Sequence, residues 1–284
     1  MNYKTILSAE ILEQHLNEPN WLILDCRFDL NNPLWGSKEY LKAHIPGAFF
    51  ADLDHDLAGP ITPSTGRHPL PDPVEWRKTV SNWGIQADTQ VVAYDTTGGS
   101  LAAVRVWWLL RAYGHEQVAL LNGGLPKWLS ENRPVTAAVS LPRNPSVFDG
   151  SLNTRLMVSS DELVRLHRDP RFRLVDARAA ERFRGESEPI DPVAGHIPGA
   201  KNRPVAQNLN ADQTFKSADQ LHNEFSEILG DIQPEQIIAY CGSGVTGGHN
   251  LLALEIAGLP GGKLYPGSWS EWIRDPNRPI ETGG

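Results

Sequence analysis

The sequence predicts an α/β protein built from two similar domains in tandem, each with a mainly parallel sheet flanked by helices. Short apolar runs typical of buried strands alternate with helical patterns along the 284 residues, which is the signature of parallel sheets. The same order of motifs occurs once in each half of the chain. We expect a first domain over residues 1–138, a second over 154–284, and between them a linker rich in Pro, Ser and Asn.

The elements of the first half follow from local patterns. Residues 8–15 predict a short helix with Ser8 as its N-cap, and Trp21–Asp25 is an apolar run typical of a buried strand. The Pro- and Gly-rich loop over residues 52–73 is longer than most connections, and such loops are often functional. Further strands are expected at 91–94 and 118–121, and helices at 74–82 and 101–112.

The second half repeats these landmarks. His-Ile-Pro-Gly-Ala occurs at 44–48 and again at 196–200, and the strand pattern at 92–95 returns at 238–241. Cys241 therefore occupies the position that Asp95 holds in the first copy. A cysteine with only a packing role would be exchanged for Ala, Val or Ser more readily than for a charged residue. The difference indicates that the first copy is inactive and that the second carries a reactive thiol.

The surroundings of Cys241 support this interpretation. The residue stands between an apolar strand pattern and a glycine-rich loop, with a helix expected over 251–257. Ligands of open α/β sheets bind at the carboxyl ends of strands. Loop amides beside a helix N-terminus favour an anion there and lower the pKa of a thiol. A buried structural cysteine before an ordinary turn is the alternative, and the repeat argues against it.

Composition restricts the partners and the location. The net charge of −8 argues against binding to nucleic acid or to an anionic membrane surface, and no apolar run is long enough to span a bilayer. The N-terminus lacks the apolar core of a secretory signal, and the two cysteines imply no disulfide framework. We therefore expect a cytoplasmic protein. We expect neither a cofactor nor a metal, because His249 and Cys241 alone do not make a metal site.

These features together resemble the two-domain sulfurtransferases of the rhodanese superfamily, over nearly the whole chain. The loop after the reactive cysteine is most similar to that of 3-mercaptopyruvate sulfurtransferases. The resemblance implies two tandem rhodanese-like domains, of which the second is catalytic. The motifs that carry it are Asp25 and Asp176 at strand ends, the two His-Ile-Pro-Gly-Ala runs, Arg105 to Trp108, Leu121 to Gly124, Ser268 to Trp272, and Cys241-Gly242-Ser243-Gly244-Val245-Thr246.

The resemblance implies that a sulfane sulfur moves from 3-mercaptopyruvate to Cys241 as a persulfide, with release of pyruvate. The sulfur then passes to cyanide or to a thiol, such as thioredoxin or a low-molecular-weight thiol. Thiosulfate is the alternative donor. Thiosulfate-preferring members tend to carry basic residues where Gly242 and Ser243 stand, and this chain has none there.

The resemblance also implies the residues of the site. Ser243, His68 and Asp54 match the serine, histidine and aspartate that surround the donor, where a hydroxyl polarised by histidine assists the cleavage of the C–S bond. Because His68 lies in the first half, we expect the site in the cleft between the domains. The amides of the loop, from Gly242 and Gly244 through Val245 to Thr246, are expected to hold the persulfide. The Thr246 hydroxyl either donates there or caps the following helix.

Arg182 matches the family's substrate-binding arginine, whose planar fork suits a carboxylate. The family's second arginine has no counterpart, because Glu188-Pro189 is followed by Ile190 and Asp191. Arg178 and Arg184 are the candidates to replace it.

Two other functions fit the sequence less well. A cysteine phosphatase of the Cys-x5-Arg type carries an arginine where this chain has Gly247, so its anion clamp is missing. A non-catalytic docking module of the same fold would require an inert Cys241.

Overall fold

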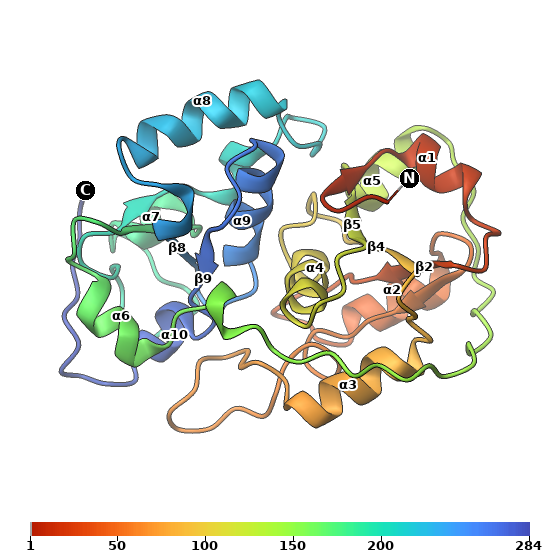
Figure 1. Ribbon diagram of the computed structural model, residues 1–284, viewed down its shortest axis with the longest axis horizontal. Coiled ribbons are helices and arrows are strands. Elements are labelled where there is room, and N and C mark those ends of the chain that lie inside the picture. Colours follow the sequence, from red (N-terminus) through yellow and green to blue (C-terminus); the bar gives the residue numbers. More distant parts are fainter. Residues whose placement is uncertain (1) are drawn as a thin grey trace. The chain divides into compact units, whose positions relative to one another are not determined.

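The computed structural model describes residues 2–284, which form two compact units (Figure 1). The first unit contains the chain up to Gly59 together with residues 70–153 and 211–215. The second contains residues 60–69, 154–210 and 216–284. Each unit has one parallel sheet with helices around it, so the expected α/β class is confirmed. The loop 60–69 belongs to the second unit although it comes early in the sequence.

The first unit has a five-stranded sheet in the order β1-β5-β4-β2-β3. Its central strands are buried along their whole length, as expected of parallel strands covered on both faces. The tryptophans of α3 and α5 are fully buried in this unit. In chain order the elements are β1 Ile6–Leu7, α1 Ala9–Gln14, β2 Trp21–Asp25, α2 Trp35–Lys42, β3 Ala48–Phe50, α3 Pro73–Asn82, β4 Gln90–Tyr94, α4 Ala102–Ala112, β5 Val118–Leu121 and α5 Gly124–Ser130.

The second unit has a four-stranded sheet in the order β7-β6-β8-β9. This is the order of β3, β2, β4 and β5 in the first unit. Within the second unit, α8 and α9 lie side by side (Figure 1). In chain order its elements are α6 Ser160–Leu166, β6 Arg173–Asp176, α7 Ala180–Phe183, β7 Lys201–Asn202, α8 Ala218–Leu229, β8 Ile237–Tyr240, α9 Gly247–Ile256, β9 Lys263–Leu264 and α10 Ser268–Trp272, with short 3₁₀ turns at Thr154–Leu156, Val205–Asn208 and Pro234–Gln236.

Side-chain caps fix the start of several helices. Ser8 accepts a hydrogen bond from the amide of Ile11, as its sequence position predicts. Asp72 accepts from two amides of the first turn of α3. Ser159 and Ser217 each form a capping box, in which the serine bonds the third residue of the helix and that residue bonds back. These helices therefore begin at positions set by local sequence.

A buried ion pair closes the carboxyl end of β2 in the first unit and of β6 in the second. The Arg27 guanidinium forks onto Asp25 and donates to the carbonyl oxygen of Ala43, at 2.7 Å. In the second unit Arg178 forks onto Asp176 and donates to the carbonyl oxygen of Gly195, also at 2.7 Å. Both arginines therefore hold the start of a His-Ile-Pro-Gly motif against the sheet.

The structure differs from expectation in two places. The helix expected at 251–257 begins at Gly247, so the loop after Cys241 is short. The linker, residues 137–153, packs on the first unit through hydrogen bonds from Ser140 to the carbonyl oxygen of Ala48 and from Ser146 to that of Ile85. Among residues 2–284, no helix is both long and apolar enough to cross a membrane.

Candidate active site

Cys241 directly follows β8 and begins the loop that leads to α9. The backbone of this loop is held by the start of α10: the amide of Trp269 donates to the carbonyl oxygen of Cys241 at 3.0 Å, and the amide of Ser270 donates to that of Gly242 at 2.9 Å. The cysteine is only 3% exposed. The thiol is thus fixed at the carboxyl edge of the sheet, where the sequence placed it.

Two groups lie close to the sulfur. The amide of Gly244 donates to the Cys241 Sγ at 3.2 Å, so one of the expected loop amides reaches it. The Ser268 hydroxyl lies 4.0 Å from the same sulfur and accepts from the amide of Cys241 at 3.0 Å. Gly244 has a φ of 80°, and a Cβ there would collide with the carbonyl oxygen of Pro266. Only glycine therefore allows this turn of the loop.

His68 and Ser243 are in direct contact. The His68 Nδ1 lies 2.7 Å from the Ser243 hydroxyl oxygen, and both residues are nearly buried. The loop that carries His68 is attached to α10, since the amide of Arg67 donates to the Ser270 hydroxyl at 3.1 Å. This loop and Ser243 belong to the same compact unit. The predicted histidine and serine are therefore in contact within one unit, and their role in catalysis stays a prediction.

Asp54 lies in the first unit, in an exposed position. Its amide donates to the Asp52 carboxylate at 2.8 Å. Although the residue is exposed, neighbouring atoms remove part of the hydration of the Asp54 carboxyl, and this effect, with the nearby charge of Asp52, raises its pKa. Its part in the site stays a prediction.

Arg182 lies over the reactive loop. Its guanidinium forks onto Glu188 at 2.7–3.0 Å, and Nη2 also donates to Asp191 at 3.1 Å. Both Nη atoms lie within 3.7 Å of the position that a Cβ of Gly242 would take. The predicted substrate-binding arginine is therefore adjacent to the residue that follows Cys241.

Arg67 lies beside Arg182, a position that was not predicted from the sequence. Its Nη1 forms an ion pair with Asp191, and its Nη2 lies 2.9 Å from the same Cβ position of Gly242. Burial lowers the pKa of Arg67, and the negative charge of a Cys241 thiolate acts in the opposite direction. The only signal in the sequence was its place next to His68 in an unusually long loop. Asp191 and Glu188, which hold the two arginines, were likewise not predicted.

Arg178 and Arg184 are the two candidates for a second arginine, and Arg178 also contacts Glu188, the carboxylate that binds Arg182. Arg178 is committed to the buried pair with Asp176, and it stacks over the Trp269 ring at 4.8 Å. Arg184 pairs with Glu186 on an exposed face. Arg67 and Arg178 each share a carboxylate with Arg182, and the expectation that Arg178 or Arg184 replaces the missing arginine stays a prediction.

The remaining loop residues have simple places. Val245 is buried, and Thr246 occupies the N-cap position of α9 with helical backbone angles. The Thr246 hydroxyl makes no capping hydrogen bond, so the expected capping role is absent. The other expected role, donation to the persulfide, stays a prediction. Among the described residues, no group of three His, Cys, Asp or Glu side chains is placed to hold a metal ion.

The corresponding loop of the first unit holds a carboxylate in place of the thiol. The Asp95 Oδ1 accepts from the amides of Thr97 and Gly99, each at 2.8 Å, and Oδ2 accepts from the amide of Leu101 at 3.1 Å. An aspartate Oδ is as many bonds from the backbone as the outer sulfur of a cysteine persulfide. The first unit therefore shows how loop amides can hold a carboxylate oxygen that is as many bonds from the backbone as the outer sulfur of a persulfide.

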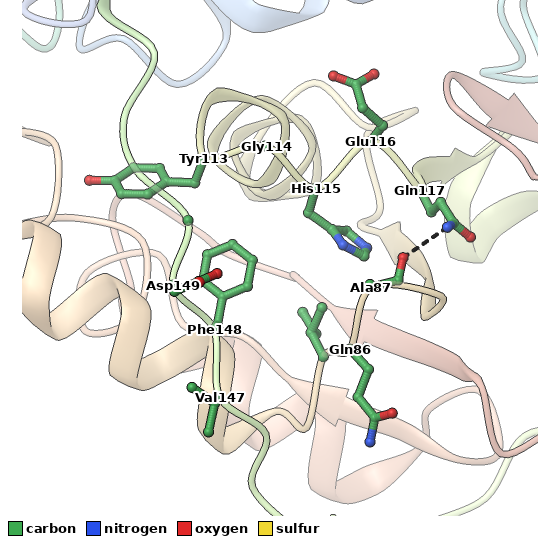
Figure 2. A pocket seen from close by; sticks show the side chains of 12 residues that line it. Gln86, Ala87, Tyr113, Gly114, His115, Glu116, Gln117, Val147, Phe148 and Asp149 are labelled. Carbon is green, nitrogen blue, oxygen red and sulfur yellow. Dashed lines mark hydrogen bonds between the residues drawn. The ribbon is translucent and has the colours of Figure 1, made fainter.

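A cavity of about 410 Å³ lies in the first unit between the end of α4 and the linker (Figure 2). His115 forms part of its wall, and the Gln117 side chain donates to the carbonyl oxygen of Ala87 (Figure 2). Burial lowers the pKa of His115, whose Nε2 lies 2.9 Å from the carbonyl oxygen of Thr89. Burial therefore favours the neutral form of this imidazole.

Comparison with known proteins identifies the family. The rhodanese-like domain profile matches residues 8–131 and again 159–275. The chain is a two-domain member of the rhodanese-like family. It is 48% identical to a probable 3-mercaptopyruvate sulfurtransferase of Pseudomonas aeruginosa over the full length of both chains, and 36% identical to the thiosulfate sulfurtransferase of Rattus norvegicus over 99% of this chain and 95% of the relative. The crystal structure of SseA, a 3-mercaptopyruvate sulfotransferase of Escherichia coli, matches with a TM-score of 0.79 and 31% identity, covering 94% of this chain and 100% of SseA.

Proposed function

We propose that this protein transfers a sulfane sulfur from 3-mercaptopyruvate to a thiol or to cyanide through a persulfide on Cys241. The observation that carries the proposal is the Cys241 sulfur, held by a loop amide, with two guanidinium groups over the next residue. Relatives named as 3-mercaptopyruvate and thiosulfate sulfurtransferases, similar over nearly the whole chain, support the same chemistry.

The proposed first step uses the thiolate as nucleophile. The Cys241 thiolate attacks the sulfur of mercaptopyruvate, a new S–S bond forms, and the C–S bond breaks. Its electron pair goes to the methylene carbon as the enolate of pyruvate, which takes up the proton of the substrate thiol. The products are pyruvate and the Cys241 persulfide anion. Loop amides then stabilise the outer sulfur, in the way that they hold the Asp95 carboxylate in the first unit.

His68 and Ser243 serve this step in the proposal. The Ser243 hydroxyl, in contact with His68, donates toward the carbonyl oxygen of the donor, where negative charge develops as the enolate forms. Asp54 is proposed to support His68. In the second step a thiolate or cyanide attacks the outer sulfur, and the Cys241 thiolate is regenerated.

The accompanying assignments are also proposals. A catalytic domain over residues 154–284 and an inactive copy over 1–138 agree with the placement of Cys241 and Asp95. Acceptors are thioredoxin-like or small thiols. Because both cysteines are free, we infer a reducing compartment, the cytoplasm.

The proposal predicts that wild-type protein incubated with mercaptopyruvate gains the mass of one sulfur on Cys241 and releases pyruvate. Cys241→Ser is expected to abolish both, while Cys26→Ser is expected to leave both unchanged, since Cys26 is buried in the other unit. Mass spectrometry of the intact chain and of its peptides measures the adduct. Absence of the adduct in wild type would support a docking module instead.

Thiosulfate is the second candidate donor. Several relatives named thiosulfate sulfurtransferases match the chain, and a guanidinium pair can bind a sulfonate as well as a carboxylate. The ratio of kcat/KM for the two donors decides between them. A value higher for thiosulfate would overturn mercaptopyruvate as the preferred donor.

A further inference from the structure

Arg67 reaches the reactive loop from a different part of the chain than Arg182. Residues 60–69 cross to the second unit, and their attachment to α10 fixes the backbone of Arg67. The attachment is tight, because a Cβ on Gly66 would lie 2.6 Å from the carbonyl oxygen of Gly267. The Arg274 side chain adds a hydrogen bond to the carbonyl oxygen of Thr65 at 3.0 Å. The guanidinium is therefore presented by an anchored loop.

Asp191 joins the two arginines. One carboxylate oxygen binds Nη1 of Arg67 and the other binds Nη2 of Arg182. The Asp191 side chain is only 3% exposed, so this bridge is shielded from water. It stands at the segment where the family's second arginine is missing. At this segment the Asp191 carboxylate instead positions Arg67, which comes from the loop 60–69.

Guanidinium nitrogens of both arginines lie close to Gly242, the residue that follows Cys241. Nε of Arg67 is buried without a hydrogen-bond partner among the described residues. Its Nη2 and the two Nη atoms of Arg182 lie 2.9, 3.6 and 3.7 Å from the Cβ position of Gly242. A buried, unsatisfied N–H is costly, so a site with such groups favours a ligand that accepts hydrogen bonds.

We propose that Arg67 and Arg182 together form the clamp that binds the carboxylate of the sulfur donor, with Arg67 as the second arginine. The proposal rests on the proposed function and deepens it. Nη2 of Arg67 and Nη1 of Arg182 lie above Gly242 and are not engaged by Glu188 or Asp191, so they offer donors to the two oxygens of a carboxylate next to Cys241.

The charges around the clamp explain which donor it fits. Arg67 and Arg182 are balanced by Glu188 and Asp191, so the four side chains sum to zero. A donor carboxylate therefore brings one more negative charge close to the Cys241 thiolate, and the clamp has no excess positive charge to neutralise it. A monoanionic keto acid is tolerated better than a dianion such as thiosulfate. The clamp thus favours carboxylate donors by geometry and by charge.

The test is steady-state kinetics of Arg67→Gln with mercaptopyruvate. Loss of a charged hydrogen bond is expected to raise KM about tenfold or more, with kcat changed much less. Arg67→Lys is expected to recover part of the loss, since it keeps the charge without the fork. Arg171→Gln, on an exposed arginine paired with Asp169, is the matched control and is expected to leave KM unchanged.

Folding is separated from binding by a second variant. Arg67→Gln leaves the buried Asp191 with one cation fewer, so the double variant Arg67→Gln/Asp191→Asn removes both charges and is expected to fold with the same high KM. Discharge of a preloaded persulfide by cyanide needs no donor carboxylate, and its rate is expected to stay within about twofold of wild type in Arg67→Gln.

A coupling measurement adds an independent check. Gly242→Ala places a methyl group against Arg67 Nη2 and is expected to raise KM in the wild-type background but much less in Arg67→Gln. The proposal is overturned if Arg67→Gln binds mercaptopyruvate as wild type does, or if persulfide discharge slows as much as loading. Failure of wild type itself to load sulfur would overturn the proposed function instead.

Discussion

Ser268 adopts a backbone conformation that side chains rarely take. Its φ is 54°, and the matching residue of the first unit is Gly124, with a φ of 57°. The hydroxyl explains why a serine stands there: it accepts from the amide of Cys241 and donates to the carbonyl oxygen of Tyr265 at 3.0 Å. The backbone beside the Cys241 sulfur therefore carries a strain of about 1–2 kcal/mol, which the hydrogen bonds of the Ser268 hydroxyl offset.

The strained backbone and the hydrogen bonds of the hydroxyl have opposite effects on stability, and together they predict which Ser268 variant is more stable. Ser268→Ala keeps the strained conformation and leaves the Cys241 amide unsatisfied, so we expect the free energy of unfolding to fall by about 1–3 kcal/mol. Ser268→Gly loses the same hydrogen bonds but relieves the strain, and we expect it to be more stable than Ser268→Ala. Urea unfolding measures both. An alanine variant as stable as the glycine variant would show that the backbone there is not strained.

At the scale of the element, the loop between β4 and α4 is held by its own anion. Asp95 is almost completely buried, and its carboxylate accepts from three loop amides. Burial raises the pKa of Asp95, while those hydrogen bonds oppose the rise. The carboxylate therefore stabilises the loop whose counterpart in the second unit carries Cys241.

Removal of this carboxylate is expected to be costly. Asp95→Ala leaves three amides without an acceptor, and we expect the free energy of unfolding to fall by about 3 kcal/mol or more. Asp29→Ala, which removes the acceptor of one exposed amide, is the control and is expected to cost under about 1 kcal/mol. Denaturant unfolding compares them. Equal losses would mean that water replaces the carboxylate.

The long apolar elements were predictable from sequence because their burial depends on local composition. The strand Trp21–Asp25 is found as expected, and the helix after Ser8 begins at its predicted cap. The short strands β7 and β9 carry too few residues for a periodic signal. The sequence did not predict that α9 begins at Gly247, because glycines normally disfavour helices. The helix nevertheless begins there, and it is buried along most of its length.

The site was predictable where one residue type carries the chemistry and not where contacts decide. Cys241 followed from its strand end and its divergent copy. Arg67 did not, because nothing in its neighbourhood shows that Asp191, far along the chain, would bind it. Arg178 matched a plausible substrate role by sequence, yet its guanidinium is used by Asp176. Pairing between distant charges is a property of the folded chain.

At the scale of the whole molecule, each unit carries its own core and its own buried ion pair. The core of the first unit includes Trp128 and Tyr94, and that of the second includes Trp272 and Tyr240. In both units the tyrosine hydroxyl accepts from the amide of the isoleucine in the His-Ile-Pro-Gly motif, at 3.2 and 3.3 Å. The same device is thus used twice, once in the unit that carries Cys241 and once in the unit that carries Asp95.

This repetition predicts that Arg27 and Arg178 have equivalent structural roles. Each is bound to an aspartate that is fully buried, so removal of the cation leaves an uncompensated charge in the interior. We expect Arg27→Gln and Arg178→Gln each to lower the free energy of unfolding by about 3–5 kcal/mol, while exposed Arg171→Gln stays within about 0.5 kcal/mol of wild type. Guanidinium unfolding followed by tryptophan fluorescence measures all three.

The comparison also separates structure from donor binding. If Arg178 were a substrate ligand, Arg178→Gln would raise the KM for mercaptopyruvate in the folded fraction and would spare stability. We expect the reverse: Arg178→Gln lowers the stability strongly and changes the KM far less than Arg182→Gln does. The Arg182 side chain is more exposed to water than that of Arg178 and lies next to Gly242. An Arg178 variant as stable as wild type, with a raised KM, would contradict the structural role.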